Sequence, residues 1–157
     1  MSMDDIRAIL GPLARRIMLM AGKATVENVD DSSGVQQIQA SVLQDEVLDQ
    51  VERAGCFGIT SNPKPGAFAV ILFPNGNRDT GIVIATEDQR YRPTDLNPGE
   101  VAVYDSAGNI IHLKSDGSIE VATSQLTSTG DIIANGISLM HHTHSDPQGG
   151  STGQPIG

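Results

Sequence analysis

The end of the chain holds the side chains best suited to metal chemistry. The stretch LMHHTHSDPQGGSTGQPIG at 139–157 contains three of the four histidines, His141, His142 and His144. In an extended strand, residues i and i+2 point to the same side, so His142 and His144 can address one centre while His141 faces the other way. Imidazole nitrogen is a ligand for iron, zinc, copper or nickel. The spacing therefore predicts a pair of metal ligands.

Two imidazoles are too few to hold a metal firmly, and His112 lies far upstream. Either the pair binds nothing, as in a solvated polar tail with incidental histidines, or symmetry multiplies it. Three chains around a three-fold axis would supply six imidazoles and a complete octahedral shell. A shell of that kind has no open position for substrate, so such a site would be structural.

A catalytic reading of the same residues is the alternative. The letters HTHSD at 142–146 match the opening of the H-x-H-x-D-H pattern of metallo-β-lactamase-like hydrolases. In that pattern a further histidine follows the aspartate and more ligands lie downstream, whereas Pro147 follows Asp146 here. A metallohydrolase remains the enzymatic alternative, and the departure after Asp146 counts against it.

Charge and cysteine content restrict the class of partner. The formal net charge is −9, with 19 acidic against 10 basic residues. Nucleic-acid binding depends mainly on Lys and Arg, so this balance argues against nucleic acid or an anionic membrane as partner. An OB-fold nucleic-acid-binding module would need a basic groove with stacking aromatics, and the chain has Phe57, Phe68, Phe73, Tyr91 and Tyr104 in an acidic background. The single Cys56, flanked by small and apolar residues, is expected to be a buried thiol.

The first 95 residues predict a short helix followed by a barrel. Apolar residues at i, i+3, i+4 and i+7 indicate a helix within 3–20, shortened or kinked at Gly11-Pro12. Five strands are expected, at 17–29, 37–43, 56–63, 67–73 and 81–86, with an Asn-Gly turn before the last. Five strands with irregular connections favour a small closed barrel of the OB type.

Two further features bear on where this protein is made. The acidic N-terminus does not resemble a basic secretory signal. The longest apolar run, AFAVILF at 67–73, is far shorter than a membrane span. We therefore expect synthesis in the cytoplasm and a protein that is not itself embedded in a membrane.

The sequence pattern changes after residue 95. Segments of four to six residues alternate with turn signals such as Asp116-Gly117 and Asn135-Gly136. The small β-branched residues expected to face inward are Val101, Val103, Ile110, Ile119, Val121, Ile132 and Ile137. So few apolar residues could hardly offset the ordering entropy of one chain by itself. A core shared between chains solves this, and the second half therefore predicts an oligomer, with three copies around one axis.

These features together resemble the baseplate assembly protein V family, the central spike proteins of contractile-tailed bacteriophages, in its short Mu-like form. The resemblance is carried by an OB-like first half, a turn-rich β half and the terminal MHHTHSDPQGGSTGQP. It implies an all-β homotrimer with an OB-fold collar and short N-terminal helix at 1–95. After the collar, the resemblance implies an intertwined triple-stranded β-helix shaft at 96–140 and a metal-capped apex at 141–157.

For the apex, the resemblance implies one iron ion per trimer, held by six nitrogens from His142 and His144 of each chain. His141 is not required by the pattern. Family members also hold further structural ions near the tip, such as calcium or chloride, for which this sequence shows no local motif.

The resemblance further implies a structural virion protein and not an enzyme. Such a protein is the central spike of the tail baseplate, which pierces the host outer membrane as the tail contracts. Its expected partners are two other copies of itself and the proteins of the tail tube and baseplate hub, with no nucleic acid and no small-molecule substrate. Its expected location is the baseplate tip of the virion, after assembly in the host cytoplasm.

Overall fold

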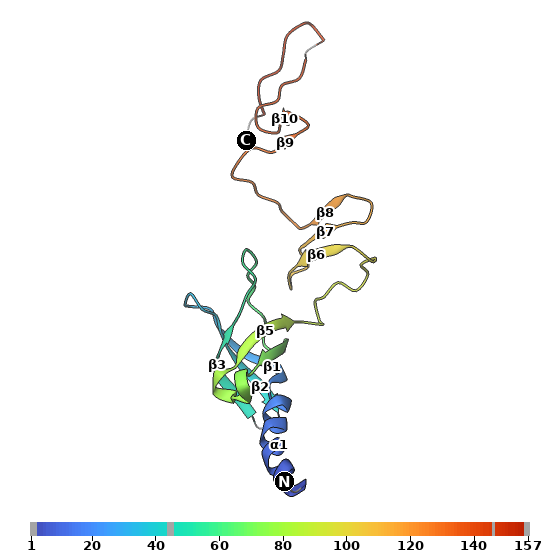
Figure 1. Ribbon diagram of the computed structural model, residues 1–157. Coiled ribbons are helices and arrows are strands. Elements are labelled where there is room, and N and C mark those ends of the chain that lie inside the picture. Colours follow the sequence, from blue (N-terminus) through green and yellow to red (C-terminus); the bar gives the residue numbers. More distant parts are fainter. Residues whose placement is uncertain (1–2, 44–45, 146, 156–157) are drawn as a thin grey trace. The chain divides into compact units, whose positions relative to one another are not determined.

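The computed structural model describes residues 3–43, 46–145 and 147–155 (Figure 1). The chain divides into two compact units, Met1–Leu96 and Asn97–Gly157. In the part of the chain that the structure describes, no helix has the length and apolarity needed to cross a bilayer.

The first unit is a helix followed by a closed five-stranded barrel. Its strands are β1 (Ala21–Asp30), β2 (Gln37–Leu43), β3 (Glu46–Arg53), β4 (Phe68–Leu72) and β5 (Ile82–Glu87). They close in the order β1-β2-β3-β5-β4, with β4 returning to pair with β1. Every pair is antiparallel except β3 with β5. The five-stranded barrel and the N-terminal helix expected from the sequence are confirmed.

Alternating side chains of these strands form the core of the barrel. Along β4 and its flanks, Ala67, Ala69, Ile71 and Phe73 are buried while the residues between them are more exposed. Successive side chains of a strand point to opposite faces, so this segment sends every second residue into the barrel. The remaining buried apolar residues are Ala24, Val26, Ile38, Ala40, Val51 and Val83.

Two of the five strand predictions need correction. The first strand begins at Ala21, because residues up to Met18 continue the helix. The third strand is β3 at Glu46–Arg53 and not 56–63. The charged residues of β3 mask its strand character, yet Val51 pairs with Ile38 and Leu48 with Ala40, which places both apolar side chains on the core side.

Residues 54–67 form a loop and not a strand, and the expectation for Cys56 is therefore wrong. Gly58 has a φ of +88°, which breaks an extended run, and the Cys56 thiol is exposed to solvent instead of buried. The loop is fastened by Arg53, whose guanidinium donates to the side chains of Gln36 at 2.7 Å and Ser61 at 2.8 Å.

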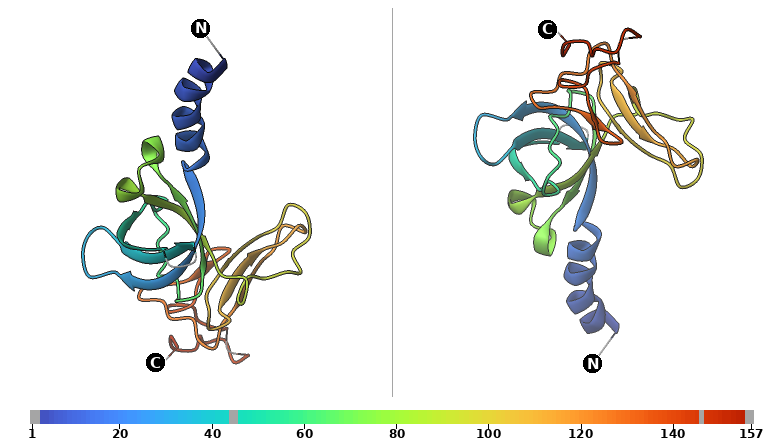
Figure 2. Two further views of the ribbon diagram at one scale, coloured as in Figure 1. Left: turned by 90° about the horizontal axis from the view of Figure 1, so that it is seen from below. Right: turned by 90° about the horizontal axis from the view of Figure 1, so that it is seen from above.

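Helix α1 (Met3–Met18) runs through Gly11 and Pro12 instead of ending there. It is joined to the barrel at its C-terminal end, where the backbone N–H of Phe73 donates to the Met20 carbonyl at 2.8 Å. Short 3-10 turns, η1 (Pro74–Gly76) and η2 (Arg78–Thr80), connect β4 to β5, and η1 packs against α1. Figure 2 shows α1 extending beyond the strands of the barrel.

The second unit consists of two small antiparallel sheets. Strands β6 (Val101–Tyr104), β7 (Ile110–Leu113) and β8 (Ile119–Ala122) form a three-stranded meander, and β9 (Ile133–Ala134) pairs with β10 (Ile137–Ser138). Asn135 and Gly136 have φ values of +49° and +81°, the two left-handed positions of a tight hairpin turn. The turn predicted from Asn-Gly is confirmed there.

Candidate metal centre and assembly surface

The structure brings the two predicted ligands together near the end of the chain. The rings of His142 and His144 lie with centroids 5.1 Å apart and planes at 87°. His142 is half-buried and His144 is exposed. Both imidazoles come from a segment outside the regular strands that follows the β9–β10 hairpin, so the hairpin and its turn set their position.

The orientation of His142 is fixed by backbone carbonyls. Its Nδ1 lies 2.8 Å from the Ser138 carbonyl oxygen and 3.1 Å from that of Leu139. A carbonyl only accepts, so Nδ1 must carry the proton and donate it. The lone pair is then on Nε2, which is the arrangement that metal-ligating histidines show, with the second ring nitrogen bonded to a carbonyl. His142 therefore fits the role of a metal ligand.

His144 is held by its backbone and not by its ring. Its N–H donates to the Thr152 hydroxyl at 2.9 Å, and its carbonyl accepts from the Thr152 N–H at 2.9 Å. An isolated antiparallel bridge between Ser145 and Ser151 adjoins these bonds. The Ser-Thr-Gly stretch thus folds back on the H-T-H segment and fixes its path.

The preceding turn is fastened by Asp131, at the base of the β9–β10 hairpin. Its carboxylate accepts from the Met140 N–H at 3.0 Å. Hydrogen bonds from the Ser138 side chain and then from the Met140 backbone hold the pKa of Asp131 below its ordinary value. The Ser138 hydroxyl also accepts from the His141 N–H at 2.8 Å. An ionised Asp131 therefore stabilises the turn that leads into the histidines.

His141 lies apart from the pair, with its Nδ1 3.4 Å from the Gln154 side-chain oxygen. Among the described residues, no three His, Cys, Asp or Glu side chains gather closely enough to hold a metal. Asp146, the acidic member of the hydrolase-like pattern, lies outside the described residues. The described part of one chain thus offers a pair of candidate ligands, His142 and His144.

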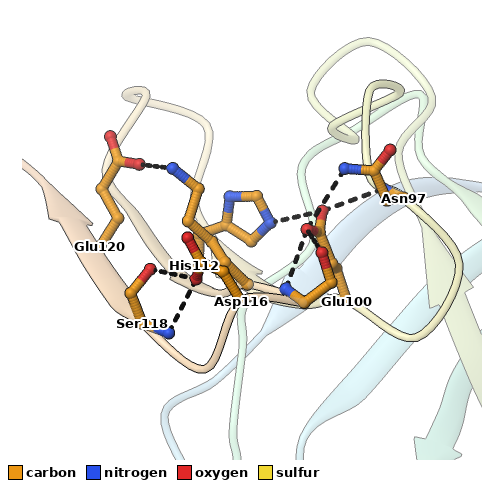
Figure 3. Close-up of polar contacts among 8 residues, drawn as sticks. Asn97, Glu100, His112, Asp116, Ser118 and Glu120 are labelled. Atoms are coloured by element: carbon orange, nitrogen blue, oxygen red, sulfur yellow. Dashed lines mark hydrogen bonds and ion pairs between the residues drawn. The ribbon is translucent and has the colours of Figure 1, made fainter.

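A second polar cluster lies at the start of this unit (Figure 3). The Glu100 side chain is only 3 % exposed. Its carboxylate accepts from the backbone N–H groups of Asn97 at 2.9 Å and Ser115 at 3.0 Å, and from the Ser115 hydroxyl at 3.0 Å. His112 Nε2 is 3.1 Å away. These bonds, led by those from the backbone of Ser115 and Asn97, hold the Glu100 pKa far below its usual range.

Sequence reasoning missed Glu100, because its partners lie up to 15 residues away and form no local motif. Around it, Lys114 donates to Glu120 at 2.7 Å and Asp116 accepts from the Ser118 hydroxyl at 2.6 Å (Figure 3). The cluster clamps the segment before β6 to the β7–β8 turn. The hydrogen bonds and ion pairs of this cluster join residues of one chain, and we assign the cluster a structural role.

One face of the β6–β7–β8 sheet is apolar and uncovered. The register places six side chains on this face: Val101, Val103, Ile111, Leu113, Ile119 and Val121. Their exposed fractions run from 43 % to 66 %. Ile110 is opposite Tyr104 and Ala122, so it belongs to the other face of the sheet, where it is half-buried. We call this six-residue surface the shaft face.

The second unit has no core of its own among its described residues. All ten buried apolar side chains of the described residues belong to the barrel unit, the last of them being Val83. Ile132 and Ile137, expected to face inward, are exposed in the single chain. The shortage of core predicted for the second half is confirmed for one chain, and the shaft face is the surface that a partner would cover.

The class of protein that carries this barrel and this paired-histidine segment follows from its relatives. Residues 23–90 match the family described as Bacteriophage Mu Gp45, N-terminal. The chain is 35 % identical to the "Baseplate puncturing device gp45" of Escherichia phage Mu, covering 94 % of each chain. It is 29 % identical to the "Mu-like prophage FluMu protein gp45" of Haemophilus influenzae, covering 96 % of this chain and 81 % of that one. The chain belongs to the Mu gp45 family of baseplate structural proteins, which is not a family of enzymes.

Proposed function

We propose that this protein is the central spike of a phage tail baseplate and pierces the host outer membrane when the tail contracts. The observation that carries the proposal is the shaft face, six exposed apolar side chains in a unit without a buried core. Three copies wound around one axis would bury this face and pair the open sheet edges. The relative from phage Mu, described as a puncturing device, supports the same role.

The gain from covering the shaft face is large for so small a unit. Complete burial of a Val, Leu or Ile side chain is worth roughly 1.5–3 kcal/mol. About half of each side chain is already covered in the single chain. Burying the rest would therefore stabilise the assembly by about 1 kcal/mol for each side chain, or roughly 6 kcal/mol per chain. Domains are typically stable by only about 5–15 kcal/mol, so this gain is enough to decide whether the unit is folded. We infer a homotrimer whose second unit is the intertwined β-helix shaft.

At the apex, His142 and His144 of three chains would supply six imidazole nitrogens to one metal ion. The proton on Nδ1 of His142 leaves Nε2 to face the metal. A full shell of nitrogens disfavours zinc, which prefers four ligands in structural sites. Iron is the choice that the family resemblance supports, with calcium or chloride as further structural ions. Bound there, the metal would act as a clamp that keeps the three chain ends from separating.

The barrel unit would form the collar that attaches the spike to the tail tube and the baseplate hub. The protein would then be located at the baseplate tip of the virion after assembly in the host cytoplasm. Piercing is mechanical in this proposal: contraction concentrates force on a narrow end that the shared core and the metal keep rigid.

Native mass spectrometry combined with elemental analysis tests the proposal on one sample of the full chain. We expect a trimer carrying about one metal ion per three chains, with iron predominant. The double variant His142→Ala with His144→Ala should lose the metal, and the control His141→Ala should keep it. A monomer at micromolar concentration would refute the shared shaft. One metal per chain, or metal retained in the double variant, would refute the assigned ligands.

A further inference from the structure

A second uncovered apolar surface lies on α1, far from the histidines in sequence. Ile6, Leu10, Leu13 and Ile17, all within α1 (Met3–Met18), follow one another at intervals of four, three and four residues. This is the spacing of the a and d positions of a coiled-coil heptad. Within one chain, Leu10, Leu13 and Ile17 are 52 %, 53 % and 59 % exposed, and Ile9 beside them is 66 % exposed. We call this stripe the helix seam.

The helix lacks the means to be stable by itself. It has 16 residues and contains Gly11 and Pro12. In a helix interior, glycine costs about 1 kcal/mol and proline about 3 kcal/mol relative to alanine. Helices of this length are marginal in water, and most helical stability in proteins comes from packing an apolar face. In α1 that face is the helix seam, and the chain's own barrel leaves it uncovered.

The two helix-breaking residues are placed where they do not interfere with a partner. At about 100° per residue, Gly11 and Arg15 lie about 160° around α1 from Leu13, and Pro12 lies about 100° from it. Gly11 is therefore on the back of the helix and the proline ring is on its flank, clear of the seam. The C-terminal end of the seam is held in place by the barrel, because Gly76 approaches the Arg16 backbone and Phe73 N–H donates to the Met20 carbonyl.

We infer that α1 forms a parallel three-helix coiled coil with the α1 helices of two other copies of this chain. A heptad seam is complementary to a helix with the same spacing, and a homotrimer presents two such helices in the same direction. The inference rests on the homotrimer proposed above. It adds a trimer contact at the N-terminal end, in a part of the chain that the shaft face and the histidines do not reach. The competing occupant is a groove on another tail protein.

Disulfide trapping in the purified full chain separates these occupants. The native thiol of Cys56 is exposed and must first be removed by Cys56→Ser. In that background, Leu13→Cys puts a thiol on the seam, and the control Arg15→Cys puts one on the back of the helix. Each variant is oxidised mildly with copper–phenanthroline and separated on a non-reducing gel, after light scattering has established its oligomeric state.

For Leu13→Cys we expect rapid formation of disulfide-linked dimers containing about two thirds of the chains, because three thiols at one level form one disulfide and leave one chain free. Arg15→Cys should remain at least tenfold slower. A trimer in which Leu13→Cys does not form the dimer, or forms it no faster than Arg15→Cys, overturns the coiled coil while leaving the spike proposal standing. A monomeric chain overturns both.

Discussion

Replacing Gly76 by alanine tests whether α1 is fixed to the barrel as the structure shows. Gly76 has a φ of +70°, and a Cβ atom built on it would lie 2.7 Å from the Arg16 carbonyl oxygen. The left-handed conformation costs a residue with a side chain roughly 1–2 kcal/mol. Forcing a methyl group against a backbone atom adds about 1–3 kcal/mol, because the helix end must move. The expected total is about 2–5 kcal/mol.

Gly58→Ala is the matched control. Gly58 also has a positive φ, +88°, but a Cβ atom there would meet nothing within 4 Å. Its cost should be limited to the backbone term of about 1–2 kcal/mol. The difference between the two variants therefore isolates the contact between η1 and the end of α1.

Equilibrium urea unfolding followed by circular dichroism gives the free energies, and amide exchange at residues 15–22 reports local opening. If the helix end detaches instead of straining the barrel, Gly76→Ala should speed exchange there with a smaller change in global stability. Should Gly76→Ala be no more destabilising than Gly58→Ala and leave exchange at 15–22 unchanged, the close packing of α1 on η1 is refuted.

Two further perturbations concern the second unit. Glu100 has a pKa far below its ordinary value, so its stabilising contribution is complete above the ordinary carboxyl pKa and is lost as pH falls through the folded value. Glu100→Gln should lower the free energy of unfolding at neutral pH, and it should reduce the further fall of that free energy in acid. Acid unfolding identical to that of the unaltered chain would contradict this. Val103→Asp, on the shaft face, should make the trimer dissociate at a higher protein concentration in light scattering, whereas Glu120→Gln, on the other face of the sheet, should leave this concentration unchanged. A Val103→Asp trimer as resistant to dilution as that of the unaltered chain would show that the face is not part of the interface.

The uncovered apolar surfaces of this chain have a common explanation in the proposed assembly. The helix seam lies before the barrel and the shaft face lies after it, while the barrel between them has a complete core. The barrel, which has its own core, thus separates two segments whose apolar surfaces are exposed in one chain. Assembly of three chains would stabilise both of these and leave the outer surface of the barrel available to other baseplate proteins.

Several elements were predictable from the sequence because local patterns determine them. Strict alternation marks β2 at Gln37–Leu43, and the apolar run at 67–73 marks β4 and its buried flanks. The Asn135-Gly136 turn follows from the ability of these two residues to adopt positive φ. The histidine spacing likewise predicted that His142 and His144 would lie together, and their rings are 5.1 Å apart.

Other features were decided only by the tertiary structure. Strand β3 is recognisable by the pairing of Val51 with Ile38, since its charged residues hide the alternation. Cys56 is exposed because the chain leaves the barrel after Arg53, which its small and apolar neighbours did not signal. The carboxylate of Glu100 is surrounded by donors from separate turns. Local periodicity determines which face of a segment is apolar, whereas long-range pairing determines what covers that face.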